Sequence, residues 1–277
     1  MHTTRLALLI ALALPVYCES NNNPLSNHSG SARAPVNGAE DSGPLAQIMG
    51  DRTGSYTGQT PPDSMSPKRK KDTIDTTANA EYLTEIERQV IIEINIVRAD
   101  PAEYAHRYLA PLRSYYRNGL LRFPGEFAIS TNEGIRALDE CIKELHVLRP
   151  LSPLSPKRGL TLAARDHVRD QARTGATGHT GSDRSTPGAR ISRYGKWEIS
   201  AGENIDYGNG NARRIVAAQL IDDGVPSRGH RRSLLNGAFQ FVGVSVGPHR
   251  FYRHMCVMDF AASYREADRI GPAKRVQ

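Results

Sequence analysis

Aromatic residues are scarce in this sequence: Phe, Trp and Tyr make up 6% of the 277 residues, with a single tryptophan. The hydrophobic fraction of 39% is ordinary, so the shortage of aromatics predicts that part of the chain lies outside a packed core. That part is residues 20–78, where Asn, Ser, Gly, Pro and Asp dominate. Such a segment cannot bury enough apolar surface to offset its ordering entropy, so we expect a disordered polar and basic spacer.

Long apolar runs are also lacking, and no stretch of the sequence is long and apolar enough to be a transmembrane helix. The apolar run Leu6–Leu14 follows a short basic start and is broken by Pro15, after which small or polar residues occur. This order is typical of a secretory signal peptide, which we assign to residues 1–19. We therefore expect a secreted, extracellular chain without a transmembrane segment. Lipid attachment at Cys18 is the less favoured alternative.

Cysteine is nearly absent, with three residues in the whole chain. If Cys18 leaves with the signal peptide, Cys141 and Cys256 remain. Secretion permits a disulfide, and two cysteines allow only one pairing. Two interpretations stay open at this point: a disulfide between Cys141 and Cys256, or two buried, inert thiols.

The sequence has no basic stripe with interleaved aromatics, so a nucleic-acid partner is not predicted. The formal net charge is nevertheless +7 and the sequence pI is about 9.4. Such a balance favours acidic partners, such as an anionic surface or anionic lipid. Solubility alone is the plainer explanation.

Regular alternation of strands and helices is missing as well. Apolar residues recur at helical spacing in the first half of the ordered part, whereas the strand patterns come late. Residues 113–125 look like a loop. Helices are predicted over 86–97, 100–108, 135–145, 158–173, 187–193 and 211–222, and strands over 198–206, 239–246 and 252–261. The turn residues Gly247 and Pro248 predict that the last two strands form an antiparallel hairpin. This order indicates an α+β fold.

Four short segments contain the residues that could carry chemistry. Each is weak evidence alone, because a single histidine is more often structural than a ligand. The segments are Gly178–Asp183, Gly202–Ile205, Asp222–Arg231 and Cys256–Ala261.

Taken in order, these segments resemble the CAP superfamily (cysteine-rich secretory protein, antigen five and pathogenesis-related proteins; the SCP domain) in its bacterial and protist form. The segment Asn95–Arg98 matches the early Asn-x-x-Arg signature of that family. The resemblance implies a CAP domain over residues 79–265, followed by a disordered tail at 266–277. It also implies a three-layer α-β-α sandwich with a mainly antiparallel central sheet and a central cleft.

The resemblance further implies that two histidines and two acidic residues line this cleft. The second acid falls on Asp222, where the family has a glutamate, and Asp223 is its alternative. The tryptophan that the family places three residues before this acid is replaced by Gln219. The four matched positions are His179, Glu203, Asp222 and His230.

Two imidazoles with carboxylates suit a divalent metal, zinc above all. They could also form a metal-free network that titrates near neutral pH. In the plainest interpretation Glu203 and Asn204 only hold loops together. Arg228 is a further candidate, since it could attract an anionic ligand to the mouth of the cleft.

The resemblance implies a non-enzymatic extracellular binding module for a lipid, sterol, glycan or protein partner. The alternative is a metal-dependent extracellular hydrolase, peptidase-like or esterase-like, with Glu203 as the general base. The sequence lacks a helical His-Glu-x-x-His motif and a positioned nucleophile, which favours the binding module. A structural cell-surface protein that binds an anionic envelope is a third possibility.

Overall fold

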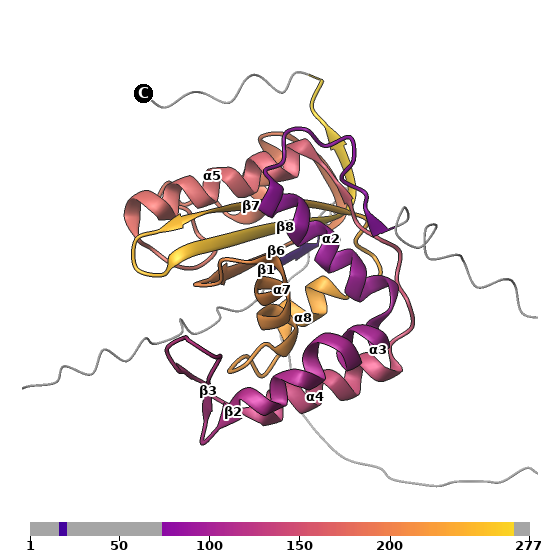
Figure 1. Ribbon diagram of the computed structural model, residues 1–277. Helices are drawn as coiled ribbons and strands as arrows, with labels where there is room; N and C mark the ends of the chain where they lie inside the picture. Colours follow the sequence, from indigo (N-terminus) through magenta and orange to yellow (C-terminus); the bar gives the residue numbers. More distant parts are fainter. Residues whose placement is uncertain (1–16, 21–73, 269–277) are drawn as a thin grey trace, which may run out of the picture.

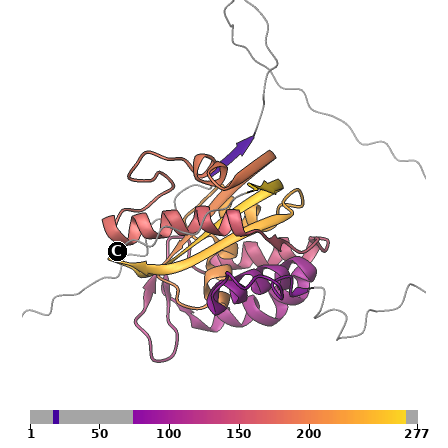
Figure 2. The ribbon, with the colours of Figure 1, turned by 90° about the horizontal axis from the view of Figure 1, so that it is seen from above.

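The computed structural model describes residues 17–20 and 74–268, which form three layers with a five-stranded sheet in the middle (Figures 1 and 2). The strands of this sheet are β1 (Tyr17–Ser20), β5 (Ser155–Pro156), β6 (Gly195–Tyr207), β7 (Phe241–His249) and β8 (Arg253–Glu266). The helices are α2 (Glu85–Ala99), α3 (Pro101–Tyr104), α4 (Ile135–Val147), α5 (Arg158–Thr174), α6 (Pro187–Ser192), α7 (Ala212–Ile221) and α8 (Gly229–Leu234), with the π-helix η1 (Ala105–Leu109) and the 3₁₀ helix η2 (Ala110–Tyr115).

The strand order in the sheet is β1-β6-β8-β7-β5. All neighbours are antiparallel except β5, which runs parallel to β7. The predicted hairpin between the last two strands is confirmed, and so is the α+β class with a mainly antiparallel sheet. β1 lies within and just after the predicted signal peptide and pairs with β6, Tyr17 opposite Glu203. Removal of residues 1–19 stays a prediction.

Side-chain alternation along the strands separates the two covering layers. On β8, Val257 and Ala261 pack toward α5, whereas Met258 and Phe260 join the core beneath α2 and α7. One position of β7 that faces α5 is Gly243, where a Cβ atom would lie 2.1 Å from the carbonyl carbon of Leu160. Glycine is therefore required there for the close contact between α5 and the sheet.

Residues 113–125, expected to be a loop, carry structure of their own. They include the end of η2 and most of a three-stranded sheet made of β2 (Tyr116–Arg117), β3 (Leu120–Leu121) and β4 (Ile129–Ser130). The reason is the two-residue turn Asn118-Gly119, where both φ angles are positive (50° and 73°). Asn-Gly with two positive φ angles is the sequence of a tight hairpin turn, which the sequence prediction overlooked.

The first contacts of the domain begin before residue 79, the predicted boundary. The side-chain nitrogen of Asn95 donates to the carbonyl oxygen of Ile74 (3.0 Å), and the hydroxyl of Thr76 donates to that of Leu154 (2.7 Å). Residues 74–78, which the sequence assigned to the spacer, thus contact the domain. Residues 21–73 of the spacer and 269–277 of the tail lie outside the described residues.

Cys141 and Cys256 are both free thiols and both buried. Cys141 lies on α4 near Arg231, whereas Cys256 lies on β8 opposite Asp206 in the register with β6. Both side chains belong to the same buried hydrophobic cluster without being joined, which agrees with the interpretation of two buried thiols. Burial raises the pKa of Cys141 to about 12, which makes it unreactive.

Candidate functional site

His179 belongs to a buried polar network on the α5 side of the sheet. Its Nδ1 lies 2.8 Å from Oε1 of Glu203 on β6. The other carboxylate oxygen of Glu203 accepts a hydrogen bond from Arg190 on α6 (2.7 Å). Glu203 and Arg190 are almost completely buried. Both oxygens of Glu203 therefore already hold a partner.

Asp259 on β8 lies opposite Glu203 in the register and belongs to the same network. It is fully buried, and neither of its side-chain oxygens has a hydrogen-bond partner among the described residues. Burial first, and then the charge of Glu203, raise the pKa of Asp259 well above its usual range. Burial thus favours the protonated form of Asp259. The sequence reasoning did not select it, although an acid inside the apolar strand segment Val257–Ala261 was the available signal.

The pKa of Glu203 shifts in the opposite direction to that of Asp259. Burial disfavours its ionised form, but the hydrogen bond from His179 and the charge of Arg190 outweigh it and lower the pKa of Glu203. A carboxylate with a lowered pKa and two occupied oxygens is a weak proton acceptor. This argues against Glu203 as the general base of a hydrolase.

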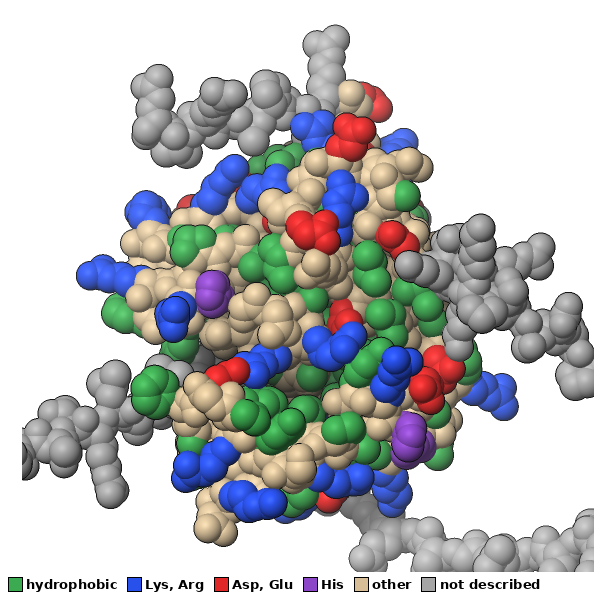
Figure 3. All heavy atoms as spheres, viewed as in Figure 1, with side chains coloured by type: hydrophobic (Ala, Val, Ile, Leu, Met, Phe, Trp, Pro, Cys, Tyr) green, Lys and Arg blue, Asp and Glu red, His purple; other side chains and the backbone are tan. Residues whose placement is uncertain are grey.

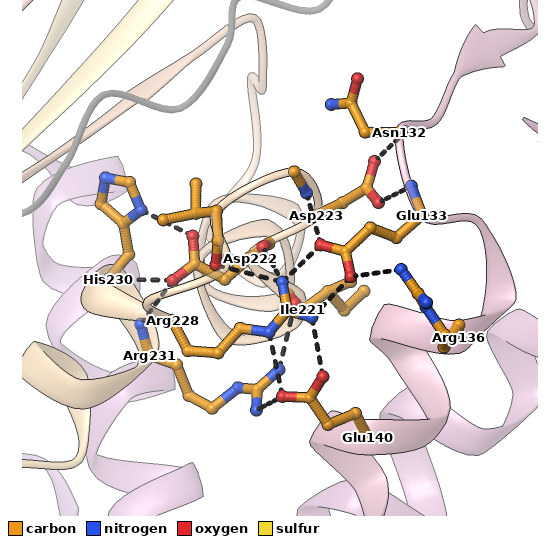
Figure 4. Close-up of polar contacts among 12 residues, drawn as sticks. Asn132, Glu133, Arg136, Glu140, Ile221, Asp222, Asp223, Arg228, His230 and Arg231 are labelled. Atoms are coloured by element: carbon orange, nitrogen blue, oxygen red, sulfur yellow. Dashed lines mark hydrogen bonds and ion pairs between the residues drawn. The ribbon is translucent and has the colours of Figure 1, made fainter.

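His230 forms a second pair, with Asp222 (Figure 4). Nδ1 of His230 lies 2.7 Å from Oδ1 of Asp222. The other oxygen of Asp222 accepts from the backbone nitrogens of His230 (2.9 Å) and Arg231 (3.3 Å). Asp222 stands just after α7 with a left-handed φ of 55°, which turns its side chain back toward the first turn of α8. It satisfies backbone donors that the start of a helix leaves unpaired.

The secondary candidates Asp223 and Arg228 anchor the segment before α4 to the turn between α7 and α8 (Figure 4). The carboxylate of Asp223 accepts from the backbone nitrogens of Asn132 (2.6 Å) and Glu133 (2.7 Å). Arg228 donates to the carboxylates of Glu133 (2.6 Å) and Glu140 (2.9 Å). Arg228 is therefore occupied by two acids, which argues against its attracting an anionic ligand.

The two histidine pairs lie on opposite faces of the sheet. Glu203 bonds to His179, whereas the side chain of its neighbour Asn204 donates to the carbonyl oxygen of His230 (3.0 Å). Consecutive side chains of a strand point to opposite faces, so β6 separates the two pairs. Among the described residues there is no group of three or more His, Cys, Asp or Glu side chains that could hold a metal ion.

These positions do not fit a metal shared by His179, Glu203, Asp222 and His230, because each carboxylate is held by its own histidine and the pairs lie on different faces. Zinc binding stays a prediction. Calorimetric titration of zinc into the wild type and into His230→Ala tests it. If His230 is a zinc ligand, the heat of zinc binding should be smaller for the variant than for the wild type.

A cavity of about 410 Å³ lies beside α7, between the end of β6 and the small three-stranded sheet, and opens on the face shown in Figure 3. Asp206, Gln219 and Asp222 are among its polar lining residues. Sequence reasoning missed it because one wall comes from residues 113–125, which were expected to be a plain loop. Its aromatic and aliphatic wall consists of Tyr108, Leu112, Tyr116, Leu121, Phe123 and Ile129.

Residues 146–260 match the family model for CAP, the cysteine-rich secretory protein family. Residues 146–260 thus carry a CAP domain, which confirms the predicted family for this part of the chain. The match includes both histidine pairs, whereas Asn95–Arg98 lies before it. A comparison with curated proteins found no match.

Two solved structures are similar to parts of the chain. One is an extracellular protein containing an SCP domain from Bacillus anthracis str. Ames, with 24% identity over 45% of this chain and 37% of that protein, at a TM-score of 0.34. The other is an outer surface protein from Borrelia burgdorferi, with 22% identity over 46% of this chain and 89% of that protein, also at 0.34. The similarity thus spans well under half of the Bacillus protein. Among the described residues no helix could cross a membrane.

Proposed function

We propose that this chain is a secreted, non-enzymatic binding module whose CAP domain holds a small apolar molecule in the cavity beside α7. The observation that supports this most strongly is the cavity itself, with its wall of aromatic and aliphatic side chains. Its volume of about 410 Å³ lies within the range of small-molecule sites in proteins.

Two arginines of α7 position two aromatic rings of the cavity wall. The guanidinium of Arg213 lies 3.8 Å from the ring centroid of Tyr108, and that of Arg214 lies 4.1 Å from that of Phe123. Each arginine is also paired with an acid, Arg213 with Glu93 (2.8 Å) and Arg214 with Glu126 (2.6 Å). These contacts hold Tyr108 and Phe123 against α7, so that the rings stay beside the cavity. The space is therefore preformed for a ligand.

The lining selects among the ligand classes that the family implies. A glycan needs many hydrogen-bonding groups, and a protein partner needs an exposed surface rather than a pocket. The apolar wall favours a lipid-like or sterol-like molecule, because burying its surface supplies the free energy of binding.

Binding of the neutral fluorescent probe diphenylhexatriene to the purified chain tests this proposal. We expect saturable binding with one site per chain. Ala218 lines the cavity, so Ala218→Trp should fill it and abolish binding, whereas Ala238→Trp adds the same side chain at an exposed position and should leave binding intact. Absence of saturable binding to the wild type, or equal binding by both variants, would overturn the proposal.

Secretion rests on the leader pattern at residues 1–19. We expect the exported protein to begin near residues 18–20, which N-terminal sequencing of protein from the medium would measure. A chain that stays inside the cell with its first residues intact would contradict this part of the proposal.

A further inference from the structure

The small three-stranded sheet turns one face toward the cavity and the other face away from it, at an edge of the molecule (Figure 1). Tyr116 lies opposite Leu121, and Leu121 lies opposite Ile129; these three side chains line the cavity. Because successive side chains of a strand point to opposite faces, the residues that alternate with them point away from the cavity. We call this second surface the outer face, and it consists of Arg117, Leu120, Arg122 and Ser130.

Arg122 continues the outer face one residue beyond β3. Its backbone nitrogen donates to the carbonyl oxygen of Tyr115 (2.9 Å), so the pairing of β2 and β3 extends to this position. Arg122 therefore lies on the same side as Leu120, which is opposite Arg117 in the register. Both arginines are exposed. The outer face thus presents two guanidinium groups from adjacent strands.

Acidic side chains do not compensate this charge. The sequence contains no Asp or Glu between Glu103 and Glu126, a stretch with four arginines. Glu126 itself pairs with Arg214 on α7 (2.6 Å). Among the described residues no acid forms an ion pair with Arg117 or Arg122. The outer face is therefore a site of uncompensated positive charge, on a chain whose formal net charge is +7.

Phe127 projects from the loop that joins β3 to β4. The backbone nitrogen of Glu126 donates to the carbonyl oxygen of Phe123 (3.2 Å), and Gly125 has a φ of 75° after Pro124, which is the pattern of a type II turn. Before this turn, Phe123 lines the cavity. After it, Phe127 is 92% exposed, more than any other large hydrophobic side chain among the described residues. An apolar ring left in water favours a partner that buries it.

We propose that the outer face and Phe127 dock this domain on an anionic lipid bilayer. The two arginines bind phosphate head groups, and the ring of Phe127 inserts at the boundary between the head groups and the acyl chains. Membrane binding of this kind adds an electrostatic part to an apolar part, and this surface supplies both. A single exposed ring buries too little apolar area for a stable protein interface, which favours the bilayer. The proposal does not depend on what the cavity holds, because it uses the opposite face of the sheet.

Co-sedimentation of the purified full chain with vesicles tests this proposal, using phosphatidylcholine alone and an equal mixture of phosphatidylcholine and phosphatidylglycerol. We expect binding to the anionic vesicles only. Arg117→Gln with Arg122→Gln should weaken it about 25-fold, about fivefold for each arginine. The control pair, Arg149→Gln with Arg232→Gln, removes the same charge from other exposed positions and should weaken it much less. All variants keep the basic run Lys68–Lys71, so its contribution cancels. Equal weakening by both pairs, or no binding of the wild type to anionic vesicles, would overturn the proposal.

Insertion of the ring is tested at Phe127. Phe127→Ser should weaken binding to anionic vesicles about tenfold, whereas Phe127→Trp should retain it. Tryptophan emission of Phe127→Trp should shift to the blue when anionic vesicles are added, and that of Val147→Trp, altered at an 82% exposed position of α4, should not. The native Trp197 contributes equally to both variants. Undiminished vesicle binding by Phe127→Ser, together with binding of soluble dextran sulfate, would show a site for polyanions and overturn docking on a bilayer. That result would leave the proposed function of the cavity intact.

Discussion

Arg98 is a fully buried cation whose partners are backbone carbonyl groups. Burial lowers its pKa to about 10, which still leaves it charged at neutral pH. Its planar guanidinium ties α2 to two distant segments, the one before β5 and the one after α8. The acceptors are the carbonyl oxygens of Ser152 (2.8 Å), Leu234 (2.8 Å), Asn236 (3.0 Å) and Phe239 (3.3 Å).

We predict that Arg98→Lys lowers the free energy of unfolding by about 3 kcal/mol, because a compact ammonium cannot reach all of these acceptors and leaves buried carbonyls unpaired. Urea unfolding measures the change. Arg232→Lys makes the same exchange at an exposed position and should have little effect. An Arg98→Lys midpoint equal to that of Arg232→Lys would contradict this account of Arg98.

Asp206 gives the fold a predictable pH dependence. Its pKa is about 7 in the fold against an ordinary value of 3.8, so between pH 4 and pH 7 the folded state binds more protons than the unfolded state. Stability from this group is therefore lost as the pH rises through that range. We take the free energy of unfolding of Asp206→Asn minus that of the wild type. We predict that this difference is about 3 kcal/mol more favourable to the variant at pH 8 than at pH 4. Urea unfolding of both proteins at the two pH values measures this, and parallel pH profiles would refute it.

At the scale of the element, β6 contains one residue more than its partner β8 over the same stretch. The register shifts between Glu198 and Ala201, which is the mark of a β-bulge. Ile199 within this bulge has a φ of 70° and is 68% exposed. A β-branched residue in this backbone conformation is strained, at a cost of about 1–2 kcal/mol.

We predict that Ile199→Gly raises the free energy of unfolding by about 0.5–1 kcal/mol, since glycine adopts a positive φ without strain but loses more entropy on folding. Ile199→Ala removes the same exposed side chain but keeps a Cβ atom, so it should give no such gain. Thermal unfolding of the two variants compares them directly. Stabilisation of equal size in both would show that the exposed side chain, and not the backbone, was the cause.

Local signals made the helices predictable. Asp100 accepts from the backbone nitrogen of Glu103, Thr186 from that of Ala189 and Asn211 from that of Arg214, so the starts of these three helices coincide with side-chain caps. The hairpin around Asn118-Gly119 was missed because its strands are two residues long and lack a period-two pattern. Its turn was the only local evidence.

At the scale of the whole molecule, the sequence predicted which elements form and in what order better than it predicted on which side of the sheet a side chain lies. The order of motifs identified the family, but four side chains distant in sequence were expected in one cleft. The structure pairs His179 with Glu203 and His230 with Asp222 across the sheet. The side of the sheet that Glu203 faces depends on the bulge upstream in β6, and no sequence pattern indicated that bulge.

The two buried thiols provide a prediction for the whole fold. Iodoacetamide at pH 8 should leave Cys141 and Cys256 unmodified in the native protein, because burial raises the pKa of both and blocks access. In denaturant without a reductant, both should be alkylated, which peptide mass spectrometry measures. Alkylation that requires prior reduction would show that they form a disulfide instead.

The bulge in β6 also has a consequence for how this domain tolerates insertions and deletions. Glu203 and Asn204 are consecutive and always face opposite sides of the sheet, but the bulge sets which of them faces α5 and which faces α8. Deleting one residue at Ile199 while the upstream pairing of β6 is kept would turn the Glu203 carboxylate toward α8 and the Asn204 amide toward Arg190. A deletion of one residue there would therefore remove both the contact of His179 with Glu203 and the bond from Asn204 to the carbonyl oxygen of His230.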